Sequence, residues 1–194
     1  MQIDGHSFPV FPLPDLVLFP GVKVPLHIFE PRYVQMINDQ LDSLGFFVLA
    51  TYCSSEQEDF YSTACLAKII DYKEVENDHY NIIIEGTEIV RIHEVDSNRL
   101  YRQVRTSPYA LNCVKEEPED ISALKKHLIV FLKNLNNQLG LTPEYADTVE
   151  QMDSMELIQY MSFMAPVPIA NKQELLEQKS LKEKVRLLLQ FYQS

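Results

Sequence analysis

Residues 17–33 read VLFPGVKVPLHIFEPRY, an apolar stretch interrupted by Pro20, Pro25 and Pro31. Proline fixes φ and lacks an N–H, so it fits neither a helix interior nor the middle of a sheet. Six of the eleven prolines fall within the first 31 residues, and the apolar pieces between them are too short for helices. We therefore expect bent edge strands here, joined at Phe19-Pro20-Gly21.

At Glu30 the spacing of apolar residues becomes helical. Pro31 suits the first turn of a helix, where its missing N–H has no cost, and Gly45 can end the helix. Glu30 is placed to offer its carboxylate to the unsatisfied N–H groups of the helix start. Arg32 and Tyr33 can then pack back against the strands.

Five β-rich runs follow, at residues 45–52, 61–72, 79–86, 87–95 and 100–113. Asn and Asp tolerate turn geometry, so residues 74–79 and 96–99 are predicted hairpin turns. Gly86 marks a further tight reversal or a β-bulge. Short strands with turns at this spacing predict a closed or nearly closed antiparallel barrel.

The composition changes at VKEEPED, residues 114–120, and the chain is helical after it. Apolar residues keep a three-four spacing from Ile121 to Leu139, and Thr142-Pro143 begins a shorter predicted helix. Three capping boxes follow, with a break at Pro166 and Pro168 between the first two. The boxes pair Asp153 with Glu156, Asn171 with Glu174, and Ser180 with Glu183.

This order predicts an α+β chain with a barrel subdomain at residues 1–113, a linker at 114–120 and a helical bundle at 121–194. The last helix is expected to turn an apolar face inward, formed by Leu181, Val185, Leu188, Leu189 and Tyr192.

The charge of the chain argues against polyanionic partners. Its 194 residues carry a formal net charge of -11, and neither half holds a basic stripe. Nucleic-acid binding depends on clustered Lys and Arg, so neither nucleic acid nor an anionic membrane is an expected partner. The chain shows no signal peptide and no apolar run of about 20 residues, so we expect a cytoplasmic protein.

Motifs for catalysis and for cofactors are missing from the sequence. Its five glycines lie too far apart for a phosphate-binding loop or a dinucleotide turn. The histidines never pair at i, i+4, and no nucleophile elbow is present. Cys53, Cys65 and Cys113 are odd in number and widely spaced, which favours free thiols. We expect no catalytic residues, no cofactor and no metal.

Methionines are concentrated in the second helical segment, beside Tyr160 and Phe163. They are Met152, Met155, Met161 and Met164. Flexible Met side chains fill gaps between packed helices, and Met-rich surfaces also bind varied peptides. Both interpretations stay open at this point.

Several segments together resemble the amino-terminal, substrate-binding domain of Lon proteases, in the form of small stand-alone bacterial proteins. They are FPLPDLVLFPGVKVPLHIFEPRYVQMI, ACLAKIIDY, IIIEGTEIVRI and ANKQELLEQKSLKEKVRLLLQFY. The resemblance implies a PUA-like antiparallel β-barrel with one inserted helix, followed by a C-terminal helical bundle. It also implies a domain that engages unfolded or tagged polypeptides for a protease or chaperone system, rather than an enzyme. Thr63-Ala64 departs from the small Gly-type turn that is frequent in the family.

The leading hypothesis is a non-catalytic polypeptide-binding or adaptor domain. Its candidate binding residues lie where proline leaves backbone groups unpaired, with methionines as an opposite wall: Phe19, His27, Phe29, Tyr33, Met161 and Met164. The expected structural positions are Pro20, Gly21, Pro25, Glu30, Pro31, Arg32 and Gly86.

Two alternatives remain open. The first is RNA binding by a PUA-like barrel through residues 98–105, where Arg99, Arg102 and Arg105 would share one strand. The second is a small-molecule sensor with its ligand in a cleft between barrel and bundle.

Overall fold

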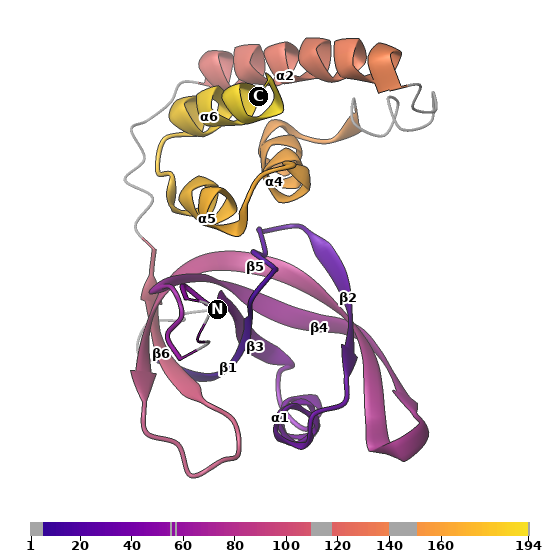
Figure 1. The fold of residues 1–194 in the computed structure, drawn as a ribbon, viewed down its shortest axis with the longest axis vertical. Helices are drawn as coiled ribbons and strands as arrows, with labels where there is room; N and C mark the ends of the chain where they lie inside the picture. Colours follow the sequence, from indigo (N-terminus) through magenta and orange to yellow (C-terminus); the bar gives the residue numbers. More distant parts are fainter. Residues whose placement is uncertain (1–5, 55, 57, 110–117, 140–150, 194) are drawn as a thin grey trace. The chain divides into compact units, whose positions relative to one another are not determined.

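Two compact units make up the chain, Met1–Tyr109 and Ala110–Ser194 (Figure 1). The computed structural model describes residues 6–54, 56, 58–109, 118–139 and 151–193, without the side chains of 118–121 and 133–139. The predicted linker therefore lies mostly outside the described residues. Its last three residues, 118–120, already belong to a helix.

The first unit is built on a six-stranded sheet. Its elements are β1 Ser7–Leu13, β2 Lys23–Ile28, α1 Pro31–Leu41, β3 Phe46–Thr51, β4 Thr63–Val75, β5 His79–Val95 and β6 Gln103–Pro108. The strand order is β2-β5-β4-β3-β1-β6, and β6 also pairs with β5, so the pairings close on themselves. The mixed α+β class is confirmed.

One strand pairing corrects the prediction of a wholly antiparallel sheet. β1 and β3 run parallel, with Val10 opposite Val48. A parallel pair needs a long crossover. Here β2 and α1 lie in the sequence between the two strands and provide one.

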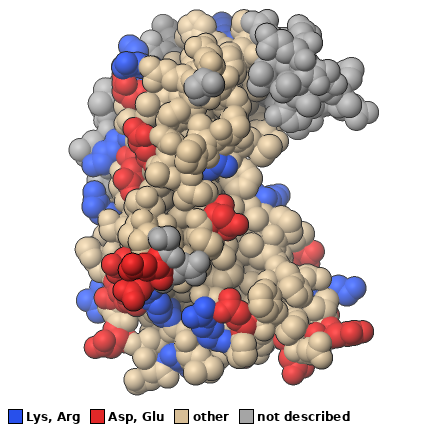
Figure 2. Space-filling model, viewed as in Figure 1, with Lys and Arg blue, Asp and Glu red and all other residues tan. Residues whose placement is uncertain are grey.

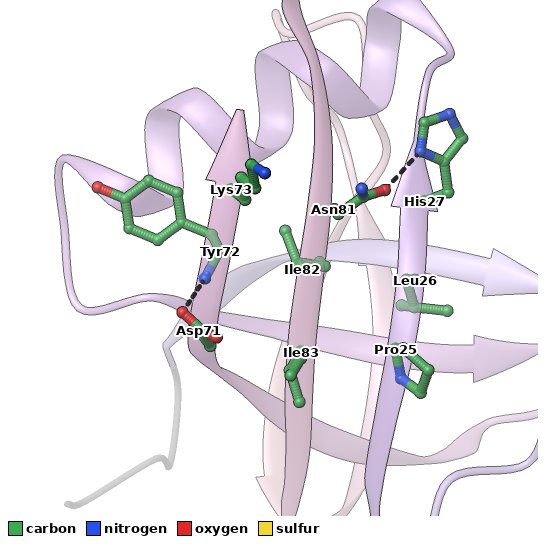
Figure 3. Close-up of a pocket in the computed structure, with 9 residues that line it drawn as sticks. All are labelled: Pro25, Leu26, His27, Asp71, Tyr72, Lys73, Asn81, Ile82 and Ile83. Atoms are coloured by element: carbon green, nitrogen blue, oxygen red, sulfur yellow. Dashed lines mark hydrogen bonds between the residues drawn. The ribbon is translucent and has the colours of Figure 1, made fainter. Parts of the chain in front are cut away.

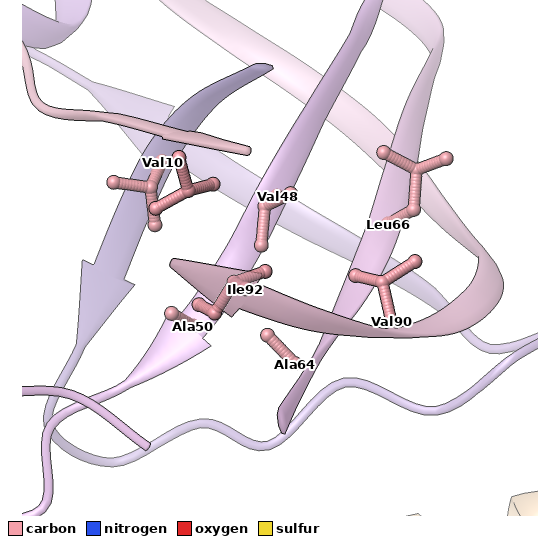
Figure 4. Close-up of a cluster of buried hydrophobic side chains, with 8 residues drawn as sticks. Val10, Val48, Ala50, Ala64, Leu66, Val90 and Ile92 are labelled. Carbon is pink, nitrogen blue, oxygen red and sulfur yellow. The ribbon is translucent and has the colours of Figure 1, made fainter. Parts of the chain in front are cut away.

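Aliphatic side chains from five strands meet in the core of this unit (Figure 4). All are at most 2% exposed: Val10, Val48, Ala50, Ala64, Leu66, Val90, Ile92 and Val104. These small and branched residues fill the space inside the ring of pairings, as the interior of a small closed sheet requires.

Gly86 lies within one 17-residue strand, so its interpretation as a bulge is confirmed and the tight reversal is wrong. The register of β4 against β5 shifts between Leu66 and Ala67, opposite this glycine. Gly21 N donates to Gly86 O (2.8 Å), and Gly86 N donates to Val22 O (3.0 Å). Gly86 is therefore the position where the Phe-Pro-Gly segment approaches the sheet.

The Phe-Pro-Gly segment itself is not the strand that the sequence predicts. Residues 16–19 do not belong to a strand, yet Val17, Leu18 and Phe19 are almost completely buried. Gly21 has φ +77°, a conformation that favours glycine. The segment is a buried turn that leads into β2.

Both predicted hairpin turns join antiparallel strands. Glu76–Asp78 forms a 3-10 turn between β4 and β5, and Asn77 and Asp78 adopt φ values of 66° and 59°. These are the residue types that tolerate left-handed geometry. Residues 96–99 lie between β5 and β6, which also pair antiparallel.

Helix α1 begins at Pro31 as predicted, but Glu30 acts differently. Its carboxylate makes no capping bond. Instead it accepts from Arg32 Nη2 at 2.7 Å and from Arg32 Nε at 3.1 Å. The Glu30 carbonyl accepts from the N–H groups of Tyr33 and Val34, both at 2.9 Å. Both Arg32 groups donate to the same oxygen, Glu30 Oε2, and this charge-assisted interaction takes the carboxylate in place of the helix N-terminus.

The second unit is helical. Its described helices are α2 Pro118–Leu139, α4 Ser154–Met164, α5 Ile169–Glu177 and α6 Leu181–Gln193. The predicted helix at Thr142-Pro143 lies outside the described residues. None of the helices described is both long and apolar enough to cross a membrane.

The capping boxes differ in outcome. The box of Asp153 and Glu156 is complete, with both reciprocal bonds present. Glu183 N donates to Ser180 Oγ at 3.3 Å, which is half of a box. The box at Asn171 is wrong, because α5 already begins at Ile169 after Pro168. The N-cap is Pro168, three residues before the predicted Asn171.

Helix α6 buries Val185 and Leu188, as its apolar spacing predicts. It also buries Lys184, which is 1% exposed and which sequence reasoning did not identify. The Lys184 amine donates to Gln159 Oε1 of α4 at 3.5 Å. Burial lowers the pKa of Lys184 to about 8.

Candidate functional site

Three exposed or half-exposed rings gather at one end of β2. His27 lies in β2, Phe29 follows that strand, and His79 begins β5. The His27 ring stacks on Phe29 with centroids 5.8 Å apart, and His79 lies 5.6 Å from His27 and 6.3 Å from Phe29. Phe29 is 57% exposed. We call these three residues the aromatic cluster.

The sheet register holds this cluster in place. His27 is directly opposite Asn81 of β5, and its Nδ1 donates to Asn81 Oδ1 at 2.8 Å. Sequence reasoning missed His79 because it was counted in the preceding turn. The alternation of His79, Asn81 and Ile83 along one strand face was the available signal.

A small hollow of about 260 Å³ lies on one side of the cluster. We call it the proline hollow. It is lined by Phe11, Pro12, Leu13, Pro14, residues 26–30, Arg32, Tyr33 and Tyr52. The Arg32 guanidinium lies 4.7 Å above the Tyr33 ring, and that ring packs 4.4 Å from Phe11. Glu30, Arg32 and Tyr33 of the Glu-Pro-Arg-Tyr segment thus form part of the wall of this recess.

A second hollow of about 390 Å³ lies across β2, β5 and β4 (Figure 3). We call it the sheet hollow. Its lining is Pro25, Leu26, His27, Asp71, Tyr72, Lys73, Asn81, Ile82 and Ile83. It shares Leu26 and His27 with the proline hollow, so β2 separates two recesses. Ile83 is 37% exposed and Tyr72 is 54% exposed, but the two do not share one face of the sheet, because Ile83 lies opposite Asp71 and Tyr72 lies opposite Ile82.

The free edge of β2 is interrupted by Pro25. In an antiparallel pair, alternate residues turn their N–H and C=O toward the neighbouring strand. Pro25 lies opposite Ile83 and has no N–H to donate, so its backbone faces away from β5. Lys23 and His27 share that direction, because they alternate with it. The edge therefore offers backbone groups at two positions and no donor at the one between them.

The structure corrects two of the candidate binding residues. Phe19 is completely buried and Met161 is 2% exposed, so neither presents its side chain at a surface. Each packs in a core, because a large apolar group gains more from burial than from exposure. Tyr33 is 6% exposed, and it lines the proline hollow. Met164 is 51% exposed but belongs to the second unit. The structure brings His27 and Phe29 together and adds His79.

Two buried titratable groups of the first unit have raised pKa values. Burial raises the pKa of Tyr33 to about 12, which keeps its phenol neutral, and burial likewise raises the pKa of the Cys65 thiol to about 12. Within the described part of the chain, no three His, Cys, Asp or Glu side chains come together as metal ligands. Apolar contact and backbone hydrogen bonds are what this surface offers.

The charged groups of the described residues do not form a basic stripe. Red and blue side chains are mixed over the face drawn in Figure 2. Arg102 pairs with Glu94 at 2.5 Å, and Arg99 lies 3.6 Å from Asp39. Only Arg105 of the three predicted arginines lies in β6, so they do not share one strand. Ion-paired arginines are poorly placed to neutralise phosphates.

Comparisons with known proteins agree with this geometry. A family model for the substrate-binding domain of ATP-dependent protease La (LON) matches residues 7–194. The Lon protease of Anaeromyxobacter dehalogenans is 26% identical over 94% of this chain, and Lon protease 1 of Bdellovibrio bacteriovorus is 27% identical over 93%. The chain spans only 22% and 24% of the length of these two curated relatives.

Solved structures show the same fold. The N-terminal domain of the Mycobacterium avium complex Lon protease superposes with a TM-score of 0.73 at 21% identity, over 97% of this chain and 99% of that one. A Lon N-terminal domain protein from Xanthomonas campestris gives 0.66 at 18% identity, over 95% and 97%. Together with the family match over nearly all of the sequence, these likenesses settle the assignment: the chain belongs to the Lon substrate-binding domain family.

Proposed function

We propose that the first unit binds extended, unfolded segments of polypeptide along β2, with the aromatic cluster as the central contact. The observation that carries the proposal is the exposure of Phe29, a large apolar side chain that contacts two imidazole rings and lines the proline hollow. Exposed aromatic groups beside recesses are the usual anchors of an interface.

The size of the proline hollow favours a side chain of a polypeptide over a small cofactor, whereas the sheet hollow, at about 390 Å³, lies within the range of small-molecule sites. The proline hollow, at about 260 Å³, is below the range of about 300–1,000 Å³ that is typical of small-molecule sites. It suits one large apolar side chain of a bound segment. The neighbouring edge of β2 supplies backbone groups at Lys23 and His27, as in binding by strand addition.

The interruption at Pro25 gives the edge a defined role. A complete row of donors would let any strand add, including another copy of the chain, and would favour aggregation. With one donor missing, backbone pairing alone is weak, and side chains that enter the hollows have to supply the remaining affinity. Such a site selects segments that carry large apolar residues.

The test is a titration of the chain with a fluorescently labelled, reduced and carboxymethylated protein that cannot fold. Phe29→Ala is expected to weaken saturable binding about tenfold, because truncation of a contact aromatic costs about 1–2 kcal/mol. Leu100→Ala is the control, since Leu100 is 66% exposed and lines neither hollow. No saturable binding, or equal losses in both variants, would refute the proposal.

We also propose that bound polypeptides are substrates of a proteolytic system. The support is the family match, whose description is that of a protease substrate-binding domain. Excess chain is then expected to slow the degradation of a labelled unfolded protein by a Lon protease, and Phe29→Ala to slow it less. Equal rates with both chains would contradict this role.

For the fold of the first unit, we infer a PUA-like barrel. The supporting observation is the closed series of pairings, in which β6 pairs with both β1 and β5. A solved structure without one of these two pairings would contradict the inference.

A further inference from the structure

Besides the edge of β2, where we propose that polypeptide binds, the sheet has a second open edge. It lies in the second half of β4, at residues 70–75. β3 pairs with β4 only from Cys65 to Lys68, and the last backbone bond on that side joins Ile69 N to Gly45 O at 2.8 Å. Ile70 lies at an irregularity in the register, and from Asp71 to Val75 β4 pairs only with β5 in the described part of the chain. Ile70 is 41% exposed and Tyr72 is 54% exposed.

The backbone direction of this edge follows from Pro25. Since Pro25 faces away from β5, its neighbours Val24 and Leu26 face toward it, opposite Ile84 and Ile82. The backbone of Ile83 and Asn81 then turns toward β4, opposite Asp71 and Lys73. Tyr72 and Glu74 therefore present their N–H and C=O groups at the open edge.

One of these groups already has a local partner. Tyr72 N donates to Asp71 Oδ1 of its own strand at 2.9 Å (Figure 3). A carboxylate over the edge is a device that protects strands against unselective pairing. The Asp71 carboxylate also limits which strand can pair at this edge. A pairing strand replaces the bond between Tyr72 N and Asp71, and it has to place a cation opposite Asp71.

We propose that this strand is the same edge of a second copy of the chain, paired antiparallel about a two-fold axis at Tyr72. The edge reads Ile-Asp-Tyr-Lys-Glu-Val at residues 70–75. With Tyr72 opposite Tyr72 of the second copy, each Asp71 lies opposite Lys73 of the other chain. Opposite charges at facing positions and paired aromatic rings both stabilise a sheet.

The neighbouring registers do not have this complementarity. In an antiparallel pair, each allowed register places one residue opposite the same residue of the other copy. The registers next to Tyr72 do so at Asp71, Lys73 or Glu74. Each of these places identical charges directly opposite each other, which is destabilising. Of the four registers, the one at Tyr72 alone pairs unlike charges. On association, the Tyr72 N–H changes its hydrogen-bond acceptor. It stops donating to Asp71 Oδ1 and donates instead to the Tyr72 carbonyl of the other copy.

Pairing of the two β4 edges also fixes where the two sheet hollows of the dimer lie. Facing residues of an antiparallel pair point to the same side of the sheet. Asp71 and Lys73 line the sheet hollow, so the dimer places two such hollows on one face. The interface is short and each chain carries a net charge of -11, so the dimer is weak and depends on screening by salt.

The experiment is sedimentation equilibrium of the full chain at up to about 1 mM, a range suited to a small interface, at about 0.15 M salt. Wild-type chain is expected to dimerise, and Asp71→Lys or Lys73→Asp to lower the association constant at least tenfold. The double variant Asp71→Lys/Lys73→Asp restores it, because the pairs are re-formed with reversed sign. Asp96→Lys, an exposed change of the same charge elsewhere, is the control.

A mixture provides the sharpest outcome. Asp71→Lys chains and Lys73→Asp chains, each monomeric alone, are expected to form a heterodimer when mixed. Wild type that stays monomeric, single variants that dimerise like wild type, or a double variant and mixture that do not associate would each overturn the proposal. If labelled unfolded protein instead shifts the Glu74 amide signal of a monomeric chain, the edge has a different occupant and the proposal fails. Loss of polypeptide binding in Phe29→Ala leaves these outcomes unchanged, so the two proposals fail separately.

Discussion

Replacing Gly86 with Ala tests the contact between the Phe-Pro-Gly segment and β5. A Cβ at Gly86 would lie 2.3 Å from the Phe19 carbonyl oxygen, 2.9 Å from the Phe19 carbonyl carbon and 3.0 Å from Cys65 Sγ. The two nearest atoms are backbone, so they cannot move aside as the end of a flexible side chain can. Relief requires the segment to withdraw from the strand.

The magnitude follows from what withdrawal breaks. Two hydrogen bonds would break, from Gly21 N to Gly86 O and from Gly86 N to Val22 O, and each contributes about 1 kcal/mol. Overpacking a filled interior costs about 1–3 kcal/mol more. Phe19 is completely buried and moves with its carbonyl. We therefore expect a loss of about 3–5 kcal/mol in the free energy of unfolding of the first unit, a large part of the roughly 5–15 kcal/mol of a typical domain.

The assay is hydrogen exchange at the Ile92 amide, which donates to Ser62 O at 2.9 Å within the first unit. Exchange of such a core amide reports unfolding of its own unit. Gly86→Ala is expected to speed it by roughly 10²- to 10³-fold or more. Gly21→Ala is the matched control, because Gly21 has a positive φ but nothing within 4 Å of an added Cβ. It costs only about 1–2 kcal/mol. An effect of Gly86→Ala no larger than that of the control would refute the reasoning.

Two further predictions concern buried titratable groups. Burial lowers the pKa of Lys184 to about 8 from about 10.4 in the unfolded chain, so the folded state binds fewer protons between these values and the second unit gains stability as pH rises through that window. Lys184→Met is expected to abolish the rise in thermal stability between pH 7.5 and 10; an unchanged rise would contradict it. Burial raises the pKa of Cys65 to about 12, whereas Cys53 is exposed. In a Cys113→Ser variant at pH 8, mass spectrometry should find iodoacetamide only on Cys53 until the protein unfolds, and native labelling of Cys65 would contradict the burial.

The sequence predicts the parts of the fold that depend on local chemistry. Whereas α1 ends at Leu41, four residues before the predicted Gly45, Pro31 begins α1 as expected, Asn77 and Asp78 make the hairpin, and Asp153 caps α4. At these positions one residue type satisfies a backbone requirement that its neighbours cannot change. Local rules therefore suffice for these element boundaries.

Long-range packing decides what local rules do not. Phe19 looks like an exposed rim residue because prolines surround it, but Gly86, 67 positions later, provides the surface that buries it. Glu30 looks like a helix cap, but Arg32 takes its carboxylate. The parallel pairing of β1 with β3 has no local signal at all.

The candidate site likewise contains residues that the sequence can indicate and one that it cannot. His27 and Phe29 could be selected from the sequence, because they follow an edge strand marked by Pro25. His79 could not, because its contact with them depends on the register of β2 against β5. A binding surface made of two strands is visible only after their pairing is known.

Binding of unfolded polypeptide at the aromatic cluster along β2 can be followed residue by residue. The most direct measurement is an NMR titration of isotope-labelled chain with unlabelled, permanently unfolded protein. The account predicts saturable shifts of the Leu26, His27, Phe29 and Asn81 amide signals, with little change at Leu100. Saturable shifts confined to other residues, with the β2 signals unmoved, would contradict it.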